Sequence, residues 1–166
     1  MRPFTSIDRL ERVRALDVPA RTLGAVADTL LRRRPGVRGV REGRPVGHAA
    51  HPMLVQLPVG AWVSAGFLDV VPGTARAATI LTGIGVASAP PAIASGLADY
   101  RHLDRHGRRV GVLHAAANVV SLALQVRSLR ERAAGRLGPG QWYGLAGTAT
   151  LAVAGLLGGH LAHRLR

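Results

Sequence analysis

The chain of 166 residues contains no cysteine and no lysine. Without cysteine it has no disulfide framework, thiolate zinc site, cysteine-ligated iron–sulfur cluster or cysteine nucleophile. Aromatic residues make up only 4% of the chain, which argues against a base-stacking surface and against a nucleic-acid partner. No nucleophile elbow and no phosphate-binding loop with lysine is present, so hydrolytic chemistry has little support.

Basic residues are abundant despite the missing lysine. Arginine supplies all 22 of them against nine acidic residues, which gives a net charge of +13 although the chain is 48% apolar. Arginine as the sole basic residue, with many alanines and glycines, indicates a G- and C-rich bacterial genome. Eleven arginines precede residue 48, and the others lie between apolar runs. This distribution is typical of a membrane protein, whose loops stay in water beside anionic headgroups.

Four apolar runs are long enough to cross a bilayer. A spanning helix needs ~20 residues, because the hydrocarbon core is ~30 Å thick and a helix rises ~1.5 Å per residue. The connections between the runs are short, which favours antiparallel neighbours. We therefore predict an all-α, integral membrane, up-down-up-down four-helix bundle. Its spans cover about 53–71, 77–97, 110–126 and 142–161 within a transmembrane domain of residues 48–166.

Residues 1–47 form a separate, arginine-rich region. Leu23, Val26 and Leu30 recur at helical spacing, which predicts amphipathic helices lying in the membrane interface with arginines toward anionic lipid headgroups. A flexible basic tail is the alternative. Most arginines fall on one side of the predicted bundle, the side that carries both ends of the chain. The positive-inside rule therefore puts both termini in the cytoplasm, at the bacterial inner membrane.

One end of the predicted bundle holds most of its ionisable residues. In an antiparallel bundle the start of the first span, the end of the second, the start of the third and the end of the fourth share one membrane face. Those places hold His51, Asp99, His114 and His160, and Asn118 follows His114 by one turn. Polar groups in hydrocarbon face the bundle interior, so we expect these side chains to converge.

Several imidazoles at one depth suggest a haem b or a transition metal. We assign His51, His114 and His160 as ligands, Asp99 as a fourth ligand or a partner of a ligating ring, and Asn118 as pocket lining. The propionates of a haem would lie near the arginines at positions 101, 105, 108 and 109. The leading hypothesis is an electron-transfer subunit with a redox partner, not an enzyme on its own. A second copy of the chain is another partner that this hypothesis admits.

Two other hypotheses stay open. In the first, the chain is a non-catalytic interaction or assembly subunit, and the histidines and Asp99 form a structural hydrogen-bond network. In the second, the polar stripe His114–Asn118–Ser121–Gln125 is a pathway for metal ions or protons. Its spacing of 4, 3 and 4 residues puts these side chains on one helix face.

Four ordered blocks resemble a bacterial family of predicted membrane proteins, number twenty-two thirty-one in the series of families of unknown function. The blocks are 47–69, 95–100, 114–118 and 158–161, and Ala49-Ala50 departs from the Pro-Leu that members commonly have. The resemblance implies a four-span membrane domain without an established activity. Members also occur joined to Rieske or c-type cytochrome domains, which implies redox company. Because this chain lacks cysteine, such a Rieske or cytochrome c partner would be a separate polypeptide.

Overall fold

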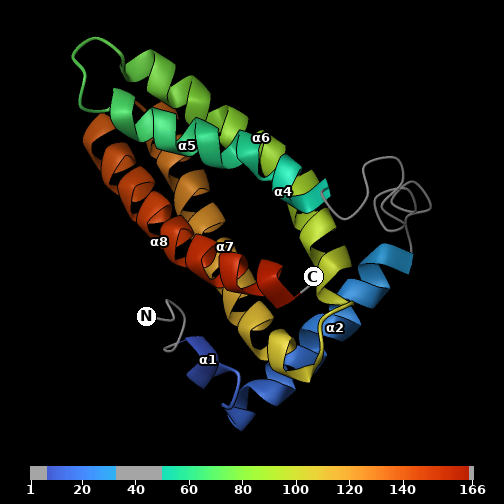
Figure 1. Ribbon diagram of the computed structural model, residues 1–166. Coiled ribbons are helices and arrows are strands. Elements are labelled where there is room, and N and C mark those ends of the chain that lie inside the picture. The colour runs from blue at the N-terminus through green and yellow to red at the C-terminus, as the bar shows by residue number, and fades with distance from the viewer. Residues whose placement is uncertain (1–6, 33–49, 165–166) are drawn as a thin grey trace.

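The computed structural model describes residues 7–32 and 50–164, and all regular secondary structure in these two ranges is helical (Figure 1). A short N-terminal part precedes four longer helical segments that pack side by side. The elements are α1 (Ile7–Leu10), a 3-10 turn η1 (Arg14–Leu16), α2 (Asp17–Arg32), α4 (Ala50–Leu54), α5 (Gln56–Leu68), α6 (Ala75–Tyr100), α7 (Arg105–Ala133) and α8 (Leu137–Arg164).

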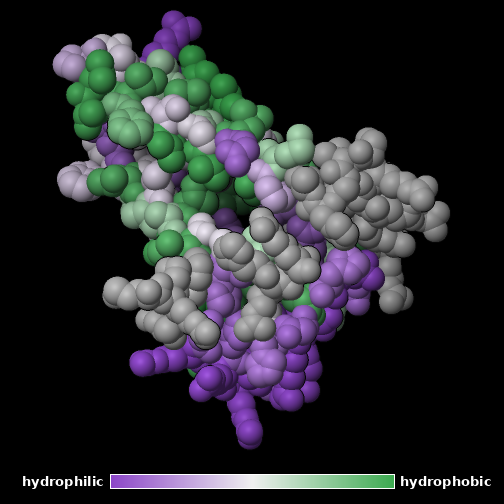
Figure 2. Space-filling model, viewed as in Figure 1, coloured by the Kyte–Doolittle hydropathy of each residue, from purple (hydrophilic) through white to green (hydrophobic). Residues whose placement is uncertain are grey.

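Three helices in the described ranges are long and apolar enough to cross a membrane: α6, α7 and residues 137–162 of α8. At ~1.5 Å per residue, 26 residues extend for about 39 Å, which exceeds the ~30 Å of a hydrocarbon core. Apolar side chains cover most of the visible surface of the long helices away from α1 and α2, whereas hydrophilic side chains gather around α1 and α2 (Figure 2). These findings confirm that the described residues form an all-helical structure, and that three of the predicted spans have the length and apolar composition to cross a membrane.

The first predicted span is divided into α4 and α5 by a turn at Val55. Pro58 explains the break, because proline has no N–H to donate to the carbonyl of Leu54 and its ring pushes that carbonyl away. Helical hydrogen bonds continue across the turn, from the Val55 N–H to His51 and from the Val59 N–H to Val55. With 13 residues, α5 alone is too short to cross a bilayer, so a spanning α4–α5 unit stays a prediction.

The helices pack as two antiparallel hairpins, α5–α6 and α7–α8 (Figure 1). Further contacts join α6 to α7 and α5 to α8, so each of these four helices packs against two of the others. Trp62 of α5 illustrates how close the first pair lies. Its indole is 5% exposed and lies directly over Gly85 of α6, where a side chain would collide with it.

Polar side chains on α7 connect it to the backbone of α8. Three side chains of α7 donate hydrogen bonds to glycine carbonyls of α8. Glycines at these positions let the two helix backbones approach closely. The Ser121 hydroxyl donates at 2.8 Å, the Gln125 amide at 3.1 Å and the Ser128 hydroxyl at 2.6 Å, to the carbonyls of Gly147, Gly144 and Gly140 respectively. Much of the predicted polar stripe therefore serves as a helix–helix seam.

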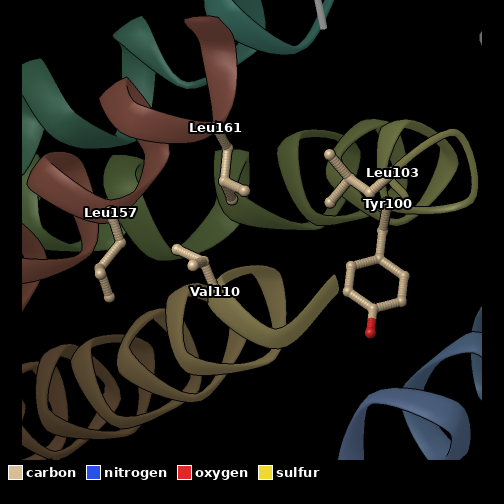
Figure 3. Close-up of a cluster of buried hydrophobic side chains, with 5 residues drawn as sticks. All are labelled: Tyr100, Leu103, Val110, Leu157 and Leu161. Carbon is tan, nitrogen blue, oxygen red and sulfur yellow. The ribbon is translucent and has the colours of Figure 1, made fainter. Parts of the chain in front are cut away.

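The N-terminal helices lie across the end of the bundle where α6 and α7 meet, and α2 packs against both. Ala20, Ala27 and Leu31 of α2 are buried, and the Tyr100 hydroxyl donates to the Ala20 carbonyl at 2.8 Å. A buried cluster beside this junction joins α6, α7, α8 and the connection between α6 and α7; it consists of Tyr100, Leu103, Val110, Leu157 and Leu161 (Figure 3).

Candidate functional site

Carboxylates of the N-terminal helices bind the arginines at the end of the bundle. Asp17 accepts from Arg109 Nε at 2.7 Å and Nη2 at 3.0 Å, and from Arg105 Nη2 at 2.6 Å. Asp28 pairs with Arg101 at 2.7 Å. The hydrogen bonds from Arg109 and then Arg105 hold the pKa of Asp17 well below its usual range. The side chain of Arg109 is only 5% exposed, so this contact orders the N-terminal region on the bundle.

We expect docking of α2 to weaken at acid pH. Because the Asp17 pKa is lower in the folded protein than in the unfolded chain, its contribution to stability is complete above pH ~4 and is lost as the pH falls toward the folded-state pKa. Asp17→Asn should speed hydrogen exchange of α2 amides at pH 7, and its difference from the unmodified protein should shrink below pH ~4. Asp28→Asn, which breaks a more exposed pair, should have a smaller effect. Equal exchange in all three proteins at pH 7 would contradict this.

His51 projects from α4 onto α6. Its Nδ1 lies 3.0 Å from the Ala92 carbonyl and 3.0 Å from the Ser95 hydroxyl. The ring also lies against Gly96, where a Cβ would come within 2.9 Å of the imidazole Cε1. Because the Ala92 carbonyl can only accept, Nδ1 carries the proton in the neutral ring, and the Nε2 lone pair is left for another contact.

His114 has the same arrangement on the second hairpin. Its Nδ1 donates to the Ala154 carbonyl of α8 at 2.8 Å, and its Cε1 lies against Gly158. The Asn118 amide nitrogen lies 3.1 Å from His114 Nε2 and 2.9 Å from the His114 carbonyl. His51 and His114 therefore each bond to a backbone carbonyl of a neighbouring helix, α6 for His51 and α8 for His114.

His160 has a different set of partners. Its Nε2 lies 2.7 Å from Glu11 Oε1 and 4.0 Å from Asp8 Oδ1, both from the N-terminal region. The residue follows Gly158 by two positions, which is about 200° around α8, so the two face different sides of that helix. The structure therefore does not direct His160 toward the His114 ring that lies against Gly158.

The other predicted site residues have identifiable positions. Asp99 is half-buried on α6, one turn after Ser95. The arginines expected near haem propionates bind protein groups: Arg101 and Arg105 bind aspartates, and Arg108 donates to the carbonyls of Leu103 and Arg101. Carboxylates of the N-terminal helices thus occupy positions where the sequence analysis placed the carboxylates of a cofactor.

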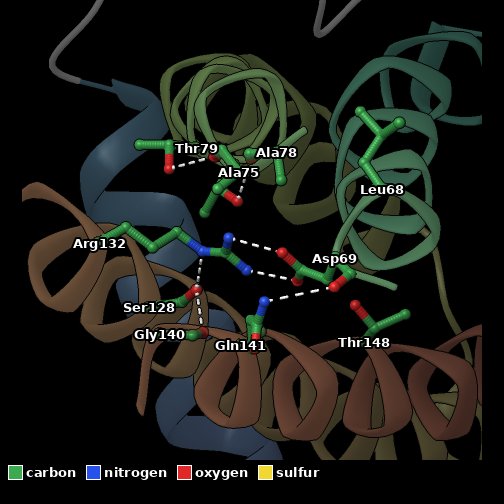
Figure 4. Close-up of polar contacts among 12 residues, drawn as sticks. Leu68, Asp69, Ala75, Ala78, Thr79, Ser128, Arg132, Gly140, Gln141 and Thr148 are labelled. Atoms are coloured by element: carbon green, nitrogen blue, oxygen red, sulfur yellow. Dashed lines mark hydrogen bonds and ion pairs between the residues drawn. The ribbon is translucent and has the colours of Figure 1, made fainter. Parts of the chain in front are cut away.

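The opposite end of the bundle carries a buried ion pair that the sequence analysis passed over. Arg132 of α7 donates from Nη1 and Nη2 to the two carboxylate oxygens of Asp69, at 2.7 and 2.5 Å (Figure 4). Ser128 accepts from Arg132 Nε at 3.0 Å, and Gln141 donates to the Asp69 carbonyl at 3.3 Å. The ion pair thus joins the end of α5 to α7, and the Gln141 contact brings in α8.

The comparison with known families assigns most of the chain to a family of membrane proteins. The model of the family described as predicted membrane protein, DUF2231, matches residues 47–166. The chain belongs to the DUF2231 family. No curated protein and no solved structure matches it.

The DUF2231 match contains His51, His114 and His160, whereas Asp8, Glu11 and Asp17 precede it. These acidic residues and Arg132 were not among the site residues predicted from the sequence. The acidic residues could have been noticed in the sequence, because four of the nine in the chain lie within 7–32, a region that was interpreted by its arginines. For Arg132 no local signal existed, since its partner lies 63 residues earlier.

Proposed function

We propose that this DUF2231 protein binds a haem b or a transition metal between His51 and His114 and transfers electrons to or from a separate redox protein. The observation that supports it is the matching orientation of the two rings. Each directs Nδ1 at a backbone carbonyl of the neighbouring helix, Ala92 for one and Ala154 for the other. Such a bond is the usual outer contact of a metal-ligating histidine, because it fixes the tautomer and directs Nε2 to the metal.

The donor set fits this role in its chemistry. Two neutral imidazoles suit haem iron, copper or zinc, and a bound haem or redox metal would supply one-electron oxidation and reduction. Ser95 and the two carbonyls orient the rings, while Gly96 and Gly158 leave the rings room to lie against α6 and α8. Asn118 would have to release His114 Nε2, and its amide keeps a second acceptor in the His114 carbonyl.

The setting of the site is part of the same proposal. The protein would lie in the bacterial cytoplasmic membrane with both termini in the cytoplasm and with the arginine-rich region near anionic headgroups. The family resemblance implies a Rieske or cytochrome c protein as its partner. That partner would be a separate polypeptide, because this chain has no cysteine for an iron–sulfur cluster or a c-type haem. His160, which binds Glu11, is left out of the His51–His114 ligand pair.

A second candidate function is a non-catalytic assembly subunit whose histidines hold helices together. The observation that favours it is the contact between Asn118 and His114 Nε2, which leaves both ring nitrogens of His114 with a partner. The seam of Ser121, Gln125 and Ser128 shows that α7 already uses polar side chains in this way.

One set of spectra separates the two candidates. Protein purified in detergent is expected to show a Soret band that shifts on reduction, or about one redox metal per chain by elemental analysis. His51→Ala and His114→Ala should lose the bound haem or metal. His102→Ala, at an exposed position, should keep it. Colourless protein without a redox metal would refute the electron-transfer proposal. A loss of thermal stability in His114→Ala with no such group to lose would support the assembly role.

A further inference from the structure

We infer that Asp8, Glu11 and His160 form a binding site for a divalent transition metal that fastens the N-terminal region to α8. Each residue offers one ligand atom, and these three atoms lie within 4.8 Å of one another. The closest pair is His160 Nε2 and Glu11 Oε1, at 2.7 Å. The site is separate from the His51–His114 pair and does not depend on the function proposed for it.

The donor set indicates the class of metal. One imidazole nitrogen and two carboxylate oxygens suit borderline divalent ions such as Zn²⁺, Mn²⁺ or Fe²⁺. The imidazole disfavours Ca²⁺ and Mg²⁺, which prefer oxygen ligands alone. The two carboxylates balance the charge of one divalent ion, which matters for a site whose Glu11 and His160 are buried.

Burial differs among the three ligands in a way that suits metal entry. The side chains of Glu11 and His160 are each 8% exposed, whereas that of Asp8 is 48% exposed. Two ligands are thus held inside the protein, and the third lies at the surface, where an ion can arrive and keep a water molecule. With three protein ligands, a fourth position is open to that water.

Neighbouring groups hold Glu11 in position. Its backbone carbonyl accepts from Arg109 Nη1 at 2.6 Å and from His106 Nδ1 at 3.1 Å. Both donors belong to α7, which also packs against α1. Because these bonds fix the main chain of Glu11, its carboxylate is already directed at His160, and such support around a ligand is what a selective metal site requires.

The local structure of α1 gives the metal a structural role. With four residues, α1 is far shorter than a helix that is stable by itself in water. Asp8 and Glu11 are three residues apart, a spacing that puts neighbouring side chains on one face of a helical turn. A metal ion bound to both and to His160 would order α1 over the end of the DUF2231 domain.

The test uses full-length protein in detergent after treatment with EDTA. Titration with Zn²⁺ and with Mn²⁺, followed by calorimetry and elemental analysis, is expected to show one saturable site per chain that the double variant His51→Ala/His114→Ala retains. Asp8→Asn and Glu11→Gln should weaken it by at least about 10-fold. Asp28→Asn is the matched control, because it removes the same charge from the N-terminal region without removing a ligand.

A second readout follows the proposed role. Zn²⁺ should slow trypsin cleavage after Arg9 and Arg12 in the unmodified protein and in Asp28→Asn, but not in Glu11→Gln. Because Asp8 is half-exposed, Asp8→Asn is expected to fold and keeps the test decisive if Glu11→Gln is unstable. The inference is overturned if no saturable site is found, or if Asp8→Asn binds as tightly as the control. His51→Ala and His114→Ala should keep this ion, so failure of the redox proposal remains distinguishable.

Discussion

Arg132→Met is expected to lower the free energy of unfolding by about 3–5 kcal/mol, measured by titration with a denaturing detergent. The Arg132 side chain is 1% exposed, and its partner Asp69 is 11% exposed. Removing the guanidinium leaves the Asp69 carboxylate buried without its two hydrogen bonds from Arg132, a far larger loss than that of a surface ion pair. Ser128 would also lose its bond to Arg132 Nε.

Two further variants determine whether burial of the ion pair is the reason for the large loss of stability expected in Arg132→Met. Arg127→Met breaks the pair with Glu131, in which Arg127 is 54% exposed, and should cost less than about 1 kcal/mol. The double variant Asp69→Leu/Arg132→Met should recover much of the stability, since a buried pair replaced by apolar groups is often nearly neutral. If Arg132→Met were as mild as Arg127→Met, the ion pair would not hold the hairpins together.

Gly85→Ala is expected to cost about 1–3 kcal/mol, because the new methyl group would overlap the Trp62 indole. A Cβ at position 85 would lie 2.2 Å from Trp62 Nε1 and 2.5 Å from Cδ1, so the ring must move. That movement also breaks the hydrogen bond from Nε1 to the Thr82 carbonyl, which is 3.3 Å long. Unfolding titrations measure the cost in stability.

Fluorescence reports the movement of the ring directly. The chain has two tryptophans, so in a Trp142→Phe background the emission comes from Trp62 alone. Gly85→Ala should shift that emission, whereas Gly66→Ala, on an exposed face of α5 with no neighbour within 4 Å, should leave it unchanged and slightly favour the helix. Identical emission and stability in the two variants would refute close packing at Gly85.

Much of the fold followed from local patterns. Charge-free runs of about 20 residues predicted α6 and α8, and α7 extends well beyond the run of 110–126 that indicated it. The longer helix arises because arginine, which is a good helix former, is frequent at both ends of the apolar run, and because Asp104 caps the N-terminus of α7. Pro58 divides the first predicted span into α4 and α5, since a proline inside a helix interrupts its hydrogen bonds.

The candidate site was predictable only in part. Helical spacing and depth identified His51 and His114, and the structure brings both into contact with carbonyls of neighbouring helices. The spacing along one helix could not reveal that His160 faces the N-terminal region, because this depends on which neighbour lies against that side of α8. Glu11 lies 149 residues before His160, and no local pattern connects them.

The sequence by itself determined that this is a helical membrane protein with basic ends, because bilayer thickness sets the length of an apolar run and charge is costly inside hydrocarbon. It also determined the helix faces that carry polar groups, through the 3.6-residue period. Tertiary structure alone decided the partners: Arg132 with Asp69, Arg109 with Asp17, and His160 with Glu11. The physical reason is that hydrogen bonds and ion pairs act over about 3 Å, and only packing brings residues so distant in the chain that close.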